Sequence, residues 1–159
     1  MYCPPGVLDR LAGLEPDVDL AASFDLHTLP GSYRAGPFAL TGVPLPHFVP
    51  NAGIRVQAGE TVLAYSGDTG PDPALAELGR DADLFIIEAT DRDGETQRPA
   101  RNLMTSTEAG ELGRQAGERR LMLTHFWPGN DRVAATTAAS AGFGREVLAA
   151  DEGLTVRFG

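Results

Sequence analysis

Residues 61–70 read Thr-Val-Leu-Ala-Tyr-Ser-Gly-Asp-Thr-Gly, an apolar run that stops at a turn of small residues carrying one carboxylate, Asp68. A short run of β-prone residues bounded by glycine predicts a buried strand. In α/β architectures, reactive side chains gather where strands end and loops begin. Asp68 is therefore the first candidate functional residue of this chain.

Two later apolar runs end in polar residues in the same way. Residues 83–90 (DLFIIEAT) and 120–125 (RLMLTH) predict strands that are covered on both faces. Between them, Thr105-Ser106-Thr107-Glu108 matches a capping box, so a helix should begin there and run to about Ala116, with Gly117 as its C-terminal stop. The pattern of buried strands and helices predicts an α/β (α+β) fold.

The rest of the chain predicts shorter elements around this centre. Asp72-Pro73 is a good start for a short helix over 74–78 that stops at Gly79. Residues 91–102 are polar and form the longest predicted loop. The other expected elements are helices over 7–14 and 132–141, strands over 24–29 and 37–47, a hairpin of 54–57 with 61–65, and a closing hairpin of 146–149 with 154–158.

Length, charge and cysteine content restrict the class of protein. The 159 residues predict a single domain. A net charge of −9, from 22 acidic and 13 basic residues without a basic stripe, argues against non-specific nucleic-acid binding. Cys3 is the only cysteine and permits no intrachain disulfide. No apolar run approaches the roughly 20 residues that span a bilayer, and the N-terminus lacks the order of a signal peptide, so we expect a cytoplasmic protein and no membrane partner.

Two of the three histidines share the position of Asp68. His47 and His125 each come directly after a β-like run, whereas His27 lies inside one and is interpreted as structural. Two imidazoles and a carboxylate from different strand ends provide ligands that suit zinc. The alternative is that all three are structural or surface residues, and their spacing alone does not decide between the two interpretations.

Several segments together resemble a known family. These are residues 44–47 (PLPH), 65–70 (YSGDTG), 87–90 (IEAT), 105–110 (TSTEAG) and 121–126 (LMLTHF). They resemble the later part of a metallo-β-lactamase-fold hydrolase of the ribonuclease Z-like branch. The resemblance covers nearly the whole chain and implies an αββα sandwich with a di-metal site, usually zinc. It also implies His47 as a ligand of one metal, Asp68 as the bridging carboxylate and catalytic residue, and His125 as a ligand of the other.

The chain also departs from the family pattern. The His-x-His-x-Asp-His signature, which supplies four ligands from an earlier loop, has no counterpart in residues 1–159. The ribonuclease members carry a histidine where Ile87 stands, and related hydrolases often carry one where Leu103 stands. We therefore expect a single metallo-β-lactamase-like domain that is N-terminally incomplete, lacking the first strands of the fold.

Three hypotheses about function follow from this resemblance. In the first, the chain is part of a metal-dependent hydrolase that uses a metal-activated water to cleave phosphodiesters or esters. In the second, it is a non-catalytic scaffold or interaction module. In the third, it is a half-site subunit that a partner chain completes. Because a bound metal needs about three or four protein ligands, this chain alone should hold zinc weakly or partially. The expected partner is a small-molecule or phosphoester substrate, and nucleic acid is not favoured by the charge. An uncovered apolar face and sheet edge would also permit a homo-oligomer.

Overall fold

A seven-stranded sheet forms the body of the molecule in the computed structural model, which describes residues 1–14, 17–94 and 101–158. The strands follow one another in chain order across the sheet, antiparallel from β3 to β6 and parallel from β6 to β9. Their bounds are β3 Gly31–Ala35, β4 Phe38–Leu45, β5 Asn51–Ala58, β6 Thr61–Tyr65, β7 Leu84–Glu88, β8 Leu121–Thr124 and β9 Leu148–Ala149.

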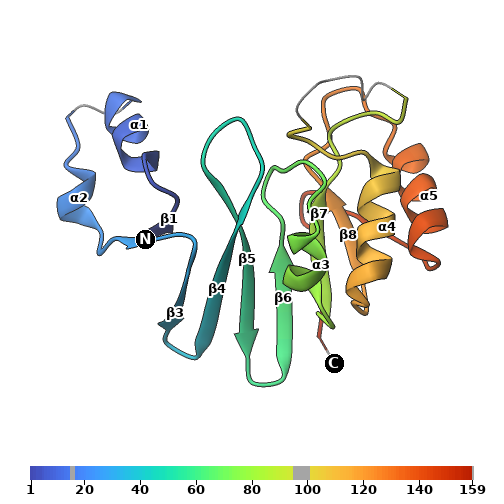
Figure 1. Cartoon of the computed structure of the whole chain (residues 1–159), viewed down its shortest axis with the longest axis horizontal. Helices are drawn as coiled ribbons and strands as arrows, with labels where there is room; N and C mark the ends of the chain where they lie inside the picture. Colours follow the sequence, from blue (N-terminus) through green and yellow to red (C-terminus); the bar gives the residue numbers. More distant parts are fainter. Residues whose placement is uncertain (15–16, 95–100, 159) are drawn as a thin grey trace.

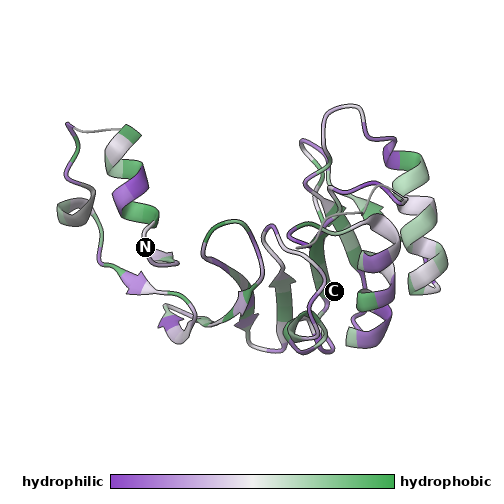
Figure 2. Cartoon of the chain, turned by 45° about the horizontal axis from the view of Figure 1, so that its top comes forward, coloured by the Kyte–Doolittle hydropathy of each residue, from purple (hydrophilic) through white to green (hydrophobic). Residues whose placement is uncertain are grey.

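Three helices form a layer against the sheet (Figure 1). They are α3 Ala74–Gly79, α4 Ser106–Ala116 and α5 Arg132–Phe143, with α4 packed between the other two. The β6, β7 and β8 strands are the most hydrophobic part of the sheet (Figure 2). The largest apolar side chains of the core are almost fully buried between sheet and helices: Leu75, Leu78, Phe85, Ile87, Met104, Leu121 and Leu123.

Residues 1–14 and 17–28 lie to one side of the sheet, beyond β3 (Figure 1). They contain α1 Val7–Leu14, α2 Leu20–Ser23 and a separate two-stranded parallel ladder of β1 Tyr2–Cys3 and β2 His27–Thr28. The rings of Tyr2 and His27 stack at 4.6 Å between centroids, and Tyr33 of β3 packs against both. His27 is thus part of an aromatic cluster that joins this segment to the sheet.

Most predicted elements are confirmed. The helix over 7–14, the hairpin of β5 with β6, and the helix that follows Asp72-Pro73 all form. The capping box is complete at α4, since Thr105 and Glu108 exchange side-chain-to-backbone hydrogen bonds. Gly117 ends this helix in the left-handed conformation, with φ +75°.

Other predictions need correction. The closing hairpin is wrong, because β9 pairs in parallel with β8 and Leu154–Phe158 contains no strand. The strand expected over 24–29 shrinks to His27–Thr28, and the last helix extends to Phe143. The loop predicted over 91–102 has no helix or strand in its described part, and residues 95–100 lie outside the described residues. No helix in the part of the chain that the structure describes has both the length and the apolar character needed to cross a membrane.

Candidate metal centre

Asp68 lies in the loop that follows β6, as the sequence predicts. The preceding Gly67 turns the chain with φ +62°, a conformation that glycine adopts without steric cost. The side-chain amide of Asn51 donates to the Asp68 carbonyl oxygen at 2.9 Å. Gly70 N–H donates to the carbonyl of Pro46 at 3.0 Å, which places the Asp68 loop beside the loop that carries His47. The Asp68 side chain is 36% exposed.

His125 directly follows β8 and has a left-handed backbone conformation, with φ +57°. This conformation is uncommon for a residue other than glycine and is frequent at functional sites. The Thr90 hydroxyl donates to the His125 carbonyl oxygen at 2.8 Å and lies 2.6 Å from ring atom Nδ1. With the hydroxyl proton engaged by the carbonyl, a neutral His125 ring carries its proton on Nδ1 and donates to Thr90 Oγ1. The Nε2 atom of His125 is therefore the one with a free lone pair.

His47 follows β4 and is fixed in the same tautomer by a different group. Its Nδ1 lies 2.9 Å from the backbone carbonyl oxygen of Asn102. A carbonyl only accepts, so Nδ1 of His47 carries the proton and Nε2 has the free lone pair. Backbone carbonyls and hydroxyls that hold Nδ1 in this way are the usual outer partners of metal-binding histidines.

Asp68 and His125 face each other closely. Oδ2 of Asp68 lies 3.5 Å from Nε2 of His125. Two ligands of one tetrahedral zinc ion, each about 2.0–2.1 Å from the metal, lie about 3.3 Å apart. The separation, the free lone pair on Nε2 and the exposed carboxylate fit a shared divalent ion.

Only this pair of candidate ligands comes together among the described residues. Within residues 1–14, 17–94 and 101–158, no three histidine, cysteine or acidic side chains come together in a way that could hold a metal. His47 lies on the adjacent loop, where its Nδ1 hydrogen-bonds the carbonyl of Asn102. It is not part of the close pair. The structure therefore brings together two of the three predicted site residues.

Glu88 links the loops that carry these residues, and it was not predicted as part of the site. Its carboxylate is fully buried and accepts backbone N–H groups of Thr69 at 3.1 Å, Thr90 at 2.8 Å and Met104 at 3.0 Å. Thr69 directly follows Asp68, Thr90 hydrogen-bonds the ring of His125, and Met104 lies two residues after Asn102. Burial raises the pKa of Glu88 to about 7, and the three donors oppose that rise. The sequence signal that could have identified Glu88 is its position as a charged residue at the end of the apolar strand β7.

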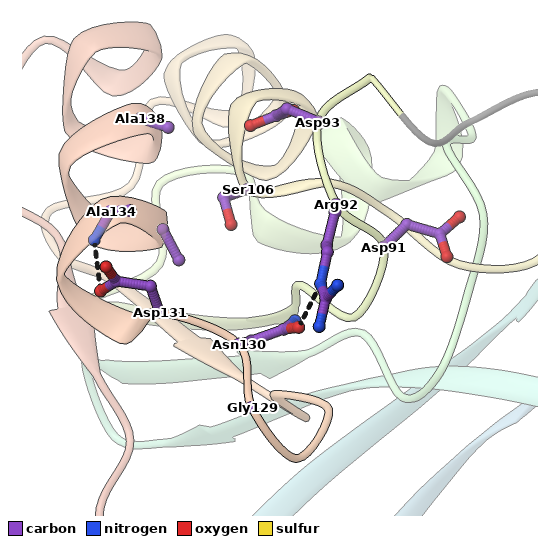
Figure 3. A pocket seen from close by; sticks show the side chains of 10 residues that line it. Asp91, Arg92, Asp93, Ser106, Gly129, Asn130, Asp131, Ala134 and Ala138 are labelled. Carbon is purple, nitrogen blue, oxygen red and sulfur yellow. Dashed lines mark hydrogen bonds between the residues drawn. The ribbon is translucent and has the colours of Figure 1, made fainter.

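Two cavities share a wall of Asp91, Arg92 and Asn130, and the second of them reaches the pair through Thr90. The first, of about 440 Å³, lies between the N-terminal ends of α4 and α5 (Figure 3). In this view Arg92 extends toward Asn130, to whose Oδ1 it donates at 3.0 Å, and Ser106 points into the cavity. The second, of about 420 Å³, is lined by Phe48, Thr90, Leu103 and Trp127 besides the shared wall. A small molecule therefore has room next to the Thr90–His125 contact.

The family model described as "Beta-lactamase superfamily domain" matches residues 1–126. An uncharacterized protein of Mycobacterium tuberculosis is 38% identical over 168 aligned residues, which cover 99% of this chain and 61% of that protein. The chain thus spans about three fifths of the length of this relative. A ribonuclease Z of Myxococcus xanthus is 46% identical over 65 residues, covering 40% of this chain and 21% of the enzyme.

Two further proteins extend the comparison. The protein named zinc phosphodiesterase ELAC protein 2 of Macaca fascicularis is 36% identical over 98 residues, covering 61% of this chain and 12% of that protein. The crystal structure of the metallo-β-lactamase fold protein YhfI from Bacillus subtilis superimposes with a TM-score of 0.80 at 24% identity, covering 96% of this chain and 62% of YhfI. The chain belongs to the metallo-β-lactamase superfamily, in its ribonuclease Z-like branch.

Proposed function

We propose that this chain contributes Asp68 and His125 to the metal site of a zinc-dependent hydrolase that cleaves phosphodiesters or esters. The observation that carries the proposal is the 3.5 Å separation between Asp68 Oδ2 and His125 Nε2, with Thr90 holding the ring in the tautomer that leaves Nε2 free. A relative named as a zinc phosphodiesterase and another named as a ribonuclease Z support the choice of metal and reaction.

The roles of the residues follow from their contacts. A bound zinc would supply Lewis acidity and neutralise negative charge on the substrate. Asp68 and His125 would hold it, and His47, which lies outside this pair, would be a ligand of a second metal. Thr90 and Asn102 fix the two imidazole rings, and Glu88 holds the loops of Asp68 and Thr90 together.

The pair is too small a ligand set for tight binding, because zinc takes three or four protein ligands. We therefore propose that the remaining ligands come from a segment or a partner chain outside the described residues. Without them, zinc affinity should be weak and the protein should behave as a scaffold or half-site. With them, Asp68 would be a ligand shared by a di-metal site, and the substrate would be a small phosphoester or ester.

The first test removes the carboxylate while keeping its shape. In the protein supplied with the remaining ligands, by a longer form of the chain or by a partner chain, Asp68→Asn should lower hydrolysis of bis(p-nitrophenyl) phosphate in the presence of zinc by at least 100-fold, and should lower zinc affinity measured by calorimetry by about 10–100-fold. His125→Ala should have the same effect on both measurements. The wild-type chain alone should bind well below two equivalents of zinc.

Asp9→Asn is the matched control, since Asp9 is an exposed carboxylate on α1 outside the site. It should leave turnover and zinc binding unchanged. Zinc binding without turnover would favour the half-site or scaffold alternative, whereas undiminished turnover in Asp68→Asn would remove Asp68 from the mechanism.

A further inference from the structure

The second cavity adjoins the proposed metal pair through one residue. Thr90 lines this cavity and also hydrogen-bonds the ring of His125 at 2.6 Å. The volume of about 420 Å³ lies in the range of cavities that bind small molecules. A group bound in the cavity would therefore lie next to the atoms proposed to take part in hydrolysis.

Two exposed aromatic side chains line this cavity. Phe48 is 64% exposed and Trp127 is 62% exposed. Phe48 directly follows His47 and packs edge-on against its ring, with centroids 5.1 Å apart, and Trp127 comes two residues after His125. Large aromatic side chains this exposed beside a cavity are a common feature of binding sites.

Hydrogen bonds join the polar residues of the cavity wall. Arg92 Nε donates to Asn130 Oδ1 at 3.0 Å, and Asn130 Nδ2 donates to the Thr90 carbonyl at 3.1 Å (Figure 3 shows the Arg92–Asn130 contact). The rest of the lining includes the apolar surface of Phe48, Leu103 and Trp127, which favours an apolar group.

We propose that this cavity binds a flat aromatic group of the substrate, joined to the ester or phosphoester that is hydrolysed at Asp68 and His125. The proposal rests on the function proposed above for that pair. A flat ring gains stacking or edge contacts with Phe48 and Trp127, whereas an alkyl group of similar size gains only burial. The selected substrate class is thus aryl rather than alkyl esters and phosphoesters.

Trp127 is the only tryptophan in the sequence, so its fluorescence reports binding without any need for turnover. Phenyl phosphate titrated into the protein, with and without zinc, should change this fluorescence in a saturable way, and ethyl phosphate should bind about tenfold more weakly. Phe48→Ala should weaken phenyl phosphate binding by about tenfold. Phe38→Ala is the matched control, since Phe38 is 45% exposed on β4 and does not line the cavity.

Kinetics of the protein completed with the remaining ligands separate this inference from the proposed function. In Trp127→Leu, KM for a methyl phenyl phosphodiester should rise about tenfold with little change in kcat, and KM for dimethyl phosphate should not change. Selective binding of phenyl phosphate without turnover by that completed protein would uphold the inference and contradict the proposed function. Equal binding of phenyl and ethyl phosphate, or turnover that is insensitive to Phe48→Ala and Trp127→Leu, would overturn the inference while leaving the function standing.

Discussion

Two fully buried carboxyl groups in this protein have opposite surroundings. Glu88 accepts hydrogen bonds from three backbone N–H groups, whereas neither Oε of Glu118 has a hydrogen-bond partner among the described residues. Burial raises the pKa of Glu118 to about 8, and its own backbone N–H and the Arg145 guanidinium oppose the rise only in part. The Glu88 carboxyl positions the loops of the site, whereas the Glu118 carboxyl lowers the stability of the folded protein once it ionises.

Glu118 should make the protein less stable as the pH rises. Below its ordinary pKa of 4.5, the folded and unfolded chains both hold the proton. Between about 4.5 and 8 the unfolded chain releases it and the folded chain keeps it, so the free energy of unfolding falls across this window and levels off above it. We expect this contribution to reach roughly 2–4 kcal/mol, and Glu118→Gln to remove it.

Thermal unfolding measured from pH 4 to pH 9 tests this prediction. The difference in Tm between Glu118→Gln and the wild type should grow in favour of the variant up to about pH 8. Glu111→Gln, which changes an exposed carboxylate on α4, should follow the wild-type curve. Parallel curves for Glu118→Gln and the wild type would show that Glu118 does not keep its proton in the folded chain.

At the scale of elements, the α4–α5 contact depends on a glycine. A Cβ at Gly110 of α4 would lie 2.2 Å from the backbone carbonyl oxygen of Ala139 in α5. Both residues are buried, and a backbone carbonyl cannot move away as a flexible side chain can. The two helices therefore approach as closely as they do only because position 110 has no side chain.

Gly110→Ala should destabilise the protein in spite of alanine's higher helix propensity. The propensity gain of about 1 kcal/mol opposes an overpacking cost that forces the two helices apart, and we expect a net loss of about 2 kcal/mol, or roughly 4–8 °C in Tm. Gly13→Ala on α1 is the matched control, because a Cβ there meets nothing within 4 Å. It should leave Tm unchanged or slightly higher, and an equal loss in both variants would contradict the role of the α4–α5 contact.

Elements with local signals were predictable from the sequence. The capping box of Thr105 and Glu108 and the stop at Gly117 fixed both ends of α4, and glycine with glutamate at 59–60 marked the β5–β6 hairpin. The C-terminal end was misread because local sequence does not encode the partner of a strand. Leu148–Ala149 pairs in parallel with β8, some 25 residues earlier in the chain, and such a pairing is decided by packing and not by a turn.

The site was predictable only in part for a related reason. Asp68 and His125 were predicted from their positions at strand ends, and the parallel order of β6, β7 and β8 brings those ends to one edge of the sheet. The groups that fix them, namely the Thr90 hydroxyl, the Asn102 carbonyl and the buried Glu88, act through contacts between loops far apart in sequence. No spacing rule reveals such contacts.

On the scale of the whole molecule, stability should be unevenly distributed. The β7 and β8 strands lie in the interior of the sheet with Phe85, Ile87 and Leu123 fully buried. By contrast, α1 has eight residues, none of them buried, and Leu14 is 77% exposed. An isolated helix of this length is marginal in water, so α1 depends on contacts that its side chains make only weakly within this chain.

Hydrogen exchange followed by mass spectrometry should therefore show α1 opening independently of the sheet. Amides of Val7–Leu14 should exchange within seconds to minutes, and those of Leu84–Glu88 and Leu121–Thr124 only through global unfolding, orders of magnitude more slowly. Slow exchange in α1 would mean that another surface covers its apolar side chains. If the protection falls on dilution, the covering surface belongs to a second copy of the chain, because self-association depends on protein concentration. If the protection does not depend on concentration, the covering surface lies within the same chain.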